Sequence, residues 1–132
     1  MPTSRRHYRV TLGNALSAHE IALKTGGRAG VHDLSLVESA IDRPYSGYYR
    51  PIHKKAAALL QSVATNHGFH DGNKRTAFIL VNLLLERSGC AVHKTSTRPH
   101  EDDIEHLILD MTLHFLDLEE VTNWFKKRIY RV

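Results

Sequence analysis

Residues 67–75 read His67-Gly68-Phe69-His70-Asp71-Gly72-Asn73-Lys74-Arg75, and the apolar run Ala77-Phe78-Ile79-Leu80-Val81 follows after Thr76. This order predicts a polar loop that leads into the N-terminus of a buried helix. Unpaired backbone N–H groups and the helix dipole make such an N-terminus a good binding place for phosphate. Lys74 and Arg75 would add formal positive charge at the same place.

The composition is that of an ordinary globular protein. The chain has 132 residues, of which 42% are hydrophobic and 24% are charged. These values predict a single domain, residues 1–132, that is long enough to bury its own core. The formal net charge of +4 permits a phosphate-bearing partner. Because Lys and Arg form no continuous stripe, we expect no direct contact with nucleic acid.

Cysteine usage and hydropathy indicate the compartment. Cys90 is the single cysteine, so no internal disulfide can form, which is typical of the reducing cytoplasm. No apolar stretch follows Met1, so we expect no signal peptide. The longest apolar run, residues 77–85, is interrupted by Asn82 and is shorter than the roughly 20 residues that span a membrane. We therefore expect a cytoplasmic protein with no membrane partner.

Hydrophobic periodicity predicts an all-α fold of about six helices. We expect them at residues 11–24, 33–41, 52–66, from 73 to the Ser88-Gly89 pair, 99–111 and 117–129. In the first helix, Leu12, Leu16, Ile21 and Leu23 are expected on or near one face. The helix that starts at Asn73 is apolar nearly all round, which predicts a central position in the bundle. Residues 90–93 are expected to form a short extended piece, and the aromatic segment 45–50 a short hairpin or flap.

The central motif has the residue types that phosphoryl or nucleotidyl transfer requires: a base, a ligand for a divalent metal, and donors that neutralise phosphate oxygens. His67 is the candidate base, because the ordinary pKa of imidazole lies near neutrality. Asp71 is the candidate ligand for Mg²⁺, which often takes only one or two protein carboxylates.

The rest of the motif would bind and shape the phosphate site. Gly72 lets the backbone approach an anion closely, and Asn73 can donate its amide N–H. Arg75 offers a planar fork that matches phosphate, whereas Lys74 acts as a point charge. Phe69 is expected to turn inward and support the loop.

Each residue also has an ordinary structural interpretation, such as a turn at Asp71-Gly72 or a solvated face at Lys74-Arg75. The combination at this spacing favours the functional interpretation. A zinc site at His67, His70 and Asp71 is not expected, because zinc sites take three or four protein ligands, Cys90 is the only thiol, and two cations immediately downstream would repel Zn²⁺.

The run from His67 to Ala77 resembles the signature of the Fic/Doc (Fido) family, His-x-Phe-x-Asp/Asn-Gly/Ala-Asn-Gly/Lys-Arg. Gly26-Gly27, Gly30 and residues 36–44 look like the N-terminal half of the Doc (death on curing) toxin branch, so the resemblance covers roughly residues 16–94. It implies a Fido-type helical bundle that binds ATP and Mg²⁺.

The resemblance also implies an activity. Fic enzymes that transfer AMP usually have Gly where this chain has Lys74, and Doc proteins have Lys. In Doc, this lysine is associated with transfer of the γ-phosphate to a Ser/Thr hydroxyl of elongation factor Tu, which arrests growth. By this resemblance His67 activates the hydroxyl, Asp71 supports Mg²⁺, and residues 72–75 hold phosphates. Two positions depart from the Doc pattern. Doc proteins often have Ala at the position of Gly72. Doc-like chains can also carry a basic residue just before the motif, where this chain has Thr65-Asn66.

Three questions stay open at this level. AMP transfer by the same site and a non-catalytic binding module with a retained fold are alternative functions. Thr97 and Glu101 match the family's inhibitory motif poorly, so we expect a separate antitoxin that binds in trans. The segment with Tyr45, Gly47, Tyr48 and Tyr49 could position the target, as family flaps do, or could simply pack on the bundle.

Overall fold

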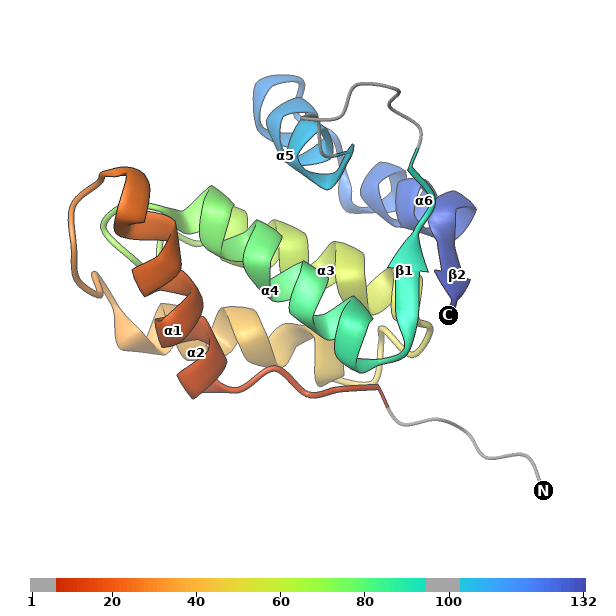
Figure 1. Cartoon of the computed structure of the whole chain (residues 1–132), viewed down its shortest axis with the longest axis horizontal. Helices are drawn as coiled ribbons and strands as arrows, with labels where there is room; N and C mark the ends of the chain where they lie inside the picture. Colours follow the sequence, from red (N-terminus) through yellow and green to blue (C-terminus); the bar gives the residue numbers. More distant parts are fainter. Residues whose placement is uncertain (1–6, 95–102) are drawn as a thin grey trace.

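The computed structural model describes residues 7–94 and 103–132 and confirms the all-α prediction (Figure 1). Six α-helices are joined by two 3₁₀ turns and a two-stranded antiparallel sheet. The elements are α1 Leu12–Ala22, η1 Leu23–Thr25, α2 Leu34–Asp42, η2 Arg43–Tyr45, α3 Ile52–Thr65, α4 Asn73–Arg87, β1 Cys90–Val92, α5 Asp103–Leu113, α6 Leu118–Arg128 and β2 Ile129–Arg131. The expected start of the fifth helix at 99–102, and Thr97 and Glu101, lie outside the described residues.

Helix α4 occupies the centre of the bundle, as its apolar sequence predicts. Figure 1 shows it running between α1 and α2 on one side and α5 and α6 on the other, with α3 alongside. Ala77, Leu80, Val81 and Leu84 of α4 are fully buried. Because α4 is held by packing along its length, its first turn is a rigid support for whatever binds there.

Side-chain caps define several helix starts. Asp33 accepts hydrogen bonds from the backbone N–H groups of Ser35 and Leu36, and Thr11 and Asp117 each form a capping box. Such caps satisfy backbone donors that have no partner inside the helix. These residues place the helix starts where the sequence predicts them.

The buried face of α1 is not made by its large apolar residues. Leu16 is 38% exposed and Ile21 is 50% exposed, whereas Ala15, Ala18, His19 and Ala22 are buried. The small side chains recur three and four residues apart, so they form one stripe of the helix. That stripe lets α1 approach α4 closely, and the larger side chains are left at its margin.

The small sheet joins the end of α4 to the end of α6. β1 and β2 pair antiparallel with Cys90 opposite Arg131 and Val92 opposite Ile129. The extended piece at 90–93 was predicted, but its partner strand was expected to be helical at Ile129. This residue instead has extended backbone angles, and its strand completes the pair.

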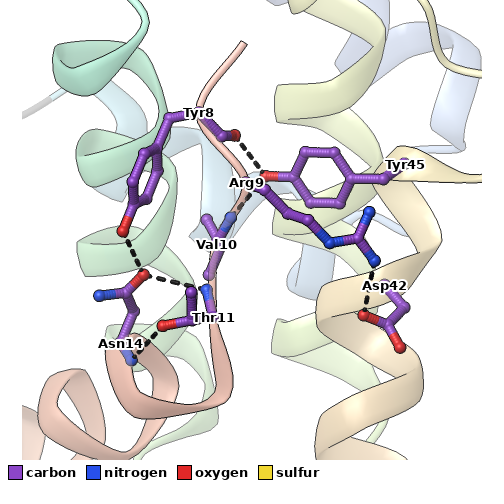
Figure 2. Close-up of polar contacts among 7 residues, drawn as sticks. All are labelled: Tyr8, Arg9, Val10, Thr11, Asn14, Asp42 and Tyr45. Atoms are coloured by element: carbon purple, nitrogen blue, oxygen red, sulfur yellow. Dashed lines mark hydrogen bonds and ion pairs between the residues drawn. The ribbon is translucent and has the colours of Figure 1, made fainter. Parts of the chain in front are cut away.

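Residues 45–50 form no strand, which corrects the expected hairpin. Tyr45 ends the 3₁₀ turn η2, and its hydroxyl group accepts a hydrogen bond from the Val10 N–H (2.9 Å) and donates one to the Tyr8 carbonyl (2.8 Å). Figure 2 shows Tyr45 of η2 bonded to the backbone of Tyr8 and Val10, which precede α1, and the Arg9 side chain bonded to Asp42 of α2 (3.2 Å). Burial raises the pKa of Tyr45, so the phenol stays protonated and able to donate.

The position of this segment also separates it from the central motif. Helix α3 has 14 residues and lies between residue 50 and His67. At about 1.5 Å per residue, its ends are roughly 20 Å apart. The aromatic segment is therefore at the opposite end of α3 from the motif. Within the described part of the chain, no helix is both long and apolar enough to cross a membrane.

Tyr45→Phe is expected to destabilise the fold. The change removes one hydroxyl group and leaves two partly buried backbone groups without a partner, which costs about 1–3 kcal/mol. Tyr48→Phe is the matched control, because Tyr48 is 83% exposed, and its effect should stay within about 0.5 kcal/mol. Urea unfolding measures both free energies, and equal stabilities of the two variants would contradict the bridging role of Tyr45.

Candidate functional site

The motif loop is held along its backbone by the segment that precedes α2. The N–H groups of His32 and Asp33 donate to the Gly68 carbonyl at 2.9 and 3.1 Å, and the His70 N–H donates to Gly30 at 3.2 Å. Val31 and Phe69 form an isolated antiparallel bridge. The loop that lies beside the motif is therefore the one with Gly27 and Gly30, both at positive φ, and not residues 45–50.

Phe69 and Asn73 fix the loop to the first turn of α4. Phe69 is only 3% exposed and packs into the core. The Asn73 side chain accepts a hydrogen bond from the Phe69 N–H (3.1 Å) and donates one to the Phe69 carbonyl (3.0 Å). The side-chain amide group that we expected to reach a phosphate is instead hydrogen-bonded within the loop.

The N-terminus of α4 has the character of an anion site. Gly72 is its N-cap residue, in the left-handed region at φ 77° and ψ 14°, and the first turn contains no acidic residue. Glycine has no side chain that could cap the helix, so the first N–H groups stay available to a ligand. The positive end of the helix dipole adds to the charges of Lys74 and Arg75.

A cavity of about 770 Å³ opens at this helix end, and the six residues predicted to act as base, metal ligand or phosphate site all line it. They are His67, Asp71, Gly72, Asn73, Lys74 and Arg75. The remaining wall comes from Ile21, Ala22, Thr25, Gly26, Gly27, Ala64, His70, Phe78, Ile79, Glu105, Ile108 and Leu109. Its volume lies in the range of about 300–1,000 Å³ that small-molecule sites occupy. Tyr45, Gly47, Tyr48 and Tyr49 are not part of this wall.

His67 has an uncommon backbone conformation. Its φ is +56°, and Phe115 is the one other non-glycine residue with positive φ in the described ranges 7–94 and 103–132. Left-handed backbone costs free energy in most residues, although histidine tolerates it better than bulky residues do. The surrounding hydrogen bonds of Gly68 and Phe69 hold His67 at the cavity wall with its side chain exposed.

Asp71 supplies a carboxylate that fits Mg²⁺ bound together with a nucleotide. Its Oδ2 accepts a hydrogen bond from the Arg28 backbone N–H at 2.9 Å, which orients the carboxylate group. Among the described residues, no three His, Cys, Asp or Glu side chains gather into a metal cage. One carboxylate with phosphate oxygens and water is the donor set that Mg²⁺ commonly takes.

The surroundings of His70 lower its pKa. Loss of solvent around the ring lowers the pKa of His70, Arg28 and His32 lower it further, and Asp71 opposes them. The ring of His32 lies edge-on to that of His70 at 5.3 Å. The folded state therefore binds fewer protons than the unfolded chain, so this group weakens folding as the pH falls below the ordinary value of 6.5.

Asn73→Ala is expected to destabilise the fold more than a matched change further along α4. It leaves the N–H and the carbonyl of Phe69 without a partner, at a cost of about 1–3 kcal/mol. Asn82→Ala removes a single bond to the Phe78 carbonyl, which the helix already uses, and should cost less than about 1 kcal/mol. Equal losses in urea unfolding would show that Asn73 does not hold the loop.

Arg28→Gln is expected to raise the pKa of His70 towards its ordinary value, because it removes a nearby positive charge and keeps the backbone N–H that binds Asp71. An NMR titration of the His70 ring follows this change. Arg50→Gln, beyond the far end of α3, is the control and should leave the His70 titration unchanged. An unchanged or lower His70 pKa in Arg28→Gln would rule out the electrostatic effect.

Comparison with known proteins places the motif within a known family. The sequence model of the Fic/DOC family matches residues 10–85 of this chain. The chain is also similar to "Toxin Doc" of Mycolicibacterium smegmatis, with 41% identity over 81 residues. That match covers 58% of this chain and 61% of the relative, so the chain spans less than two thirds of that protein.

The family match includes helices α1 to α3, most of α4 and the whole of the loop that forms the cavity wall. It extends over more than half of the 132 residues. From this match, we conclude that the chain belongs to the Fic/DOC family.

Proposed function

We propose that the chain is a Doc-like toxin with protein kinase activity, which transfers the γ-phosphate of ATP to a Ser or Thr hydroxyl group of a translation factor similar to elongation factor Tu. One observation supports this proposal above others: His67 and the positive N-terminus of α4 line the same cavity. A base and a phosphate site in one cavity are the two parts that phosphoryl transfer needs from a protein.

In this proposal His67 acts as the general base. Its imidazole takes the proton from the target hydroxyl group as the new O–P bond forms at the γ-phosphorus atom. The bond between the γ-phosphorus and the bridging oxygen breaks, and ADP leaves. The left-handed backbone of His67 keeps the ring at the cavity wall, so little reorganisation is needed before reaction.

The phosphates would be held by the first turn of α4. Backbone N–H groups at Gly72 and Asn73 and the side chains of Lys74 and Arg75 supply donors and positive charge. Asp71 would hold Mg²⁺, which when bound neutralises charge on the phosphate oxygens. Since Lys74 and Arg75 are both exposed, their side chains can adjust to a nucleotide that enters the cavity.

AMP transfer is the second candidate, and Gly72 favours it, because the Fic branch has glycine at this position. Lys74 favours the kinase reaction, because AMP-transferring relatives usually have glycine there. The two reactions use the same cavity and differ in which phosphorus atom faces the target. A non-catalytic binding module would keep the cavity and need no base.

A separate antitoxin is the proposed regulator. The cavity continues into an apolar wall made by Ile21, Phe78, Ile79, Ile108 and Leu109, which suits the apolar face of a partner helix. Coexpression with a small protein encoded next to the gene should relieve toxicity, and the two chains should copurify. A chain that is harmless alone at high level and binds no such product would contradict this regulation.

His67→Ala is expected to lower the transfer rate by at least about 10²-fold, because it removes the general base. MgATP binding should change little, because Gly72 to Arg75 are intact. ATP labelled at the γ or the α position, incubated with the protein and elongation factor Tu or cell extract, identifies the reaction. Label from the γ position supports the kinase, label from the α position supports AMP transfer, and toxicity that survives His67→Ala would contradict both.

A further inference from the structure

His19 is a buried residue of α1 that contacts Phe69 and Asp71 of the motif on its core side. Its side chain is 5% exposed, and its Nε2 atom lies 2.8 Å from the carbonyl oxygen of Asp71. The ring stacks on that of Phe69, with centroids 3.9 Å apart and an interplanar angle of 10°. Because a carbonyl oxygen can only accept, the Nε2 atom carries a hydrogen and donates it.

This contact fixes the orientation of a peptide group in the cavity wall. The peptide between Asp71 and Gly72 is planar and trans, so its N–H points opposite to its carbonyl. A carbonyl that points at His19 therefore turns the Gly72 N–H away from the buried side of α1. The residue that determines this direction is 52 positions earlier in the chain.

The next peptide group is held in the same way. The carbonyl of Gly72 accepts hydrogen bonds from the Thr76 N–H (2.9 Å) and the Thr76 hydroxyl group (2.7 Å), and Thr76 is fully buried. The opposite edge of that peptide is the Asn73 N–H. Within the part of the chain that the structure describes, neither the Gly72 N–H nor the Asn73 N–H has a protein acceptor.

Two successive N–H groups with left-handed and then right-handed backbone form a concave site for an anion. Gly72 is left-handed and Asn73 begins α4, and both line the cavity. The His19 ring lies next to Gly72, since a Cβ atom built there would be in van der Waals contact with it at 3.6 Å. The base of this site is thus formed by α1 as well as by the motif itself.

We propose that His19 is a positioning residue for nucleotide binding: its hydrogen bond to the Asp71 carbonyl holds the Gly72 and Asn73 N–H groups ready for a phosphate of the nucleotide. This inference rests on the proposed function, because it assigns His19 to the same phosphate site. Binding groups that are oriented in advance cost less to order when the ligand binds.

Two substitutions separate the hydrogen bond from the packing of the ring. His19→Phe keeps an aromatic ring against Phe69 and removes the donor. His19→Gln removes the ring and keeps an N–H donor at a similar distance from the backbone. Ser62→Ala is the matched control, because Ser62 is buried and donates to the Ala40 carbonyl at 2.7 Å, away from the cavity.

The readouts are the Kd for MgATP by calorimetry and the urea midpoint of each variant. His19→Phe should raise the Kd by about 10-fold or more, which corresponds to about 1.4 kcal/mol. His19→Gln should stay within about threefold of the wild type, as expected when the donor is retained. Ser62→Ala should lower the urea midpoint and leave the Kd unchanged, so that lost stability alone does not explain weaker binding.

A second measurement uses the wild-type protein and does not depend on the folding of a variant. In NMR spectra, the amide protons of Gly72 and Asn73 should move downfield when MgATP saturates the protein. His19→Phe with a Kd within threefold of wild type, His19→Gln as weak as His19→Phe, or unmoved Gly72 and Asn73 amides would each overturn the role of His19. Wild-type protein that binds no MgATP would overturn the proposed function together with it.

Discussion

The two hydrogen bonds between the Asn73 side chain and the backbone of Phe69 are the constraint on which the site depends. They join the motif loop to the first turn of α4, and α4 is fixed in turn by its buried face. The loop contains no helix or strand of its own. Its shape is therefore determined by the two Asn73 hydrogen bonds, by the buried Phe69 ring and by the backbone hydrogen bonds to residues 30–33. The exposed residues His67, Asp71 and Lys74 are thereby held on a rigid base.

Some residues of the motif support the loop, and others are exposed and available to a ligand. Phe69, Asn73 and Thr76 make their contacts inward, whereas His67, Lys74 and Arg75 remain exposed. A polar cavity wall gives little hydrophobic stabilisation, so the helices behind it supply the packing. His67 has a left-handed backbone, and the carbonyl groups of Asp71 and Gly72 are bonded on the buried side by His19 and Thr76. His67, Asp71 and Gly72 all line the same cavity.

The sequence predicts the parts of the fold that are encoded locally. Asp33 and Asp117 mark helix starts because their side chains accept hydrogen bonds from nearby backbone N–H groups. The apolar run of α4, residues 77–85, predicts its central position. The six site residues lie within nine positions of one another, so their gathering at one cavity follows from a loop that enters a helix.

Long-range contacts were missed by the sequence analysis. The buried stripe of α1 consists of Ala and His residues, which a pattern of large apolar residues such as Leu and Ile does not reveal. The hydrogen bond of His19 to Asp71 joins residues 52 positions apart, so no local pattern predicts it. The Tyr45 segment looked like a flap because its partner, the Val10 backbone, has no sequence signature.

A crystal structure of the protein with Mg²⁺ and a non-hydrolysable ATP analogue tests the central claim most directly. We predict electron density for the phosphates against the first turn of α4, with Mg²⁺ beside Asp71 and the His67 ring facing the terminal phosphate. Nucleotide density elsewhere on the surface, or a cavity that stays empty at saturating nucleotide, would contradict the account.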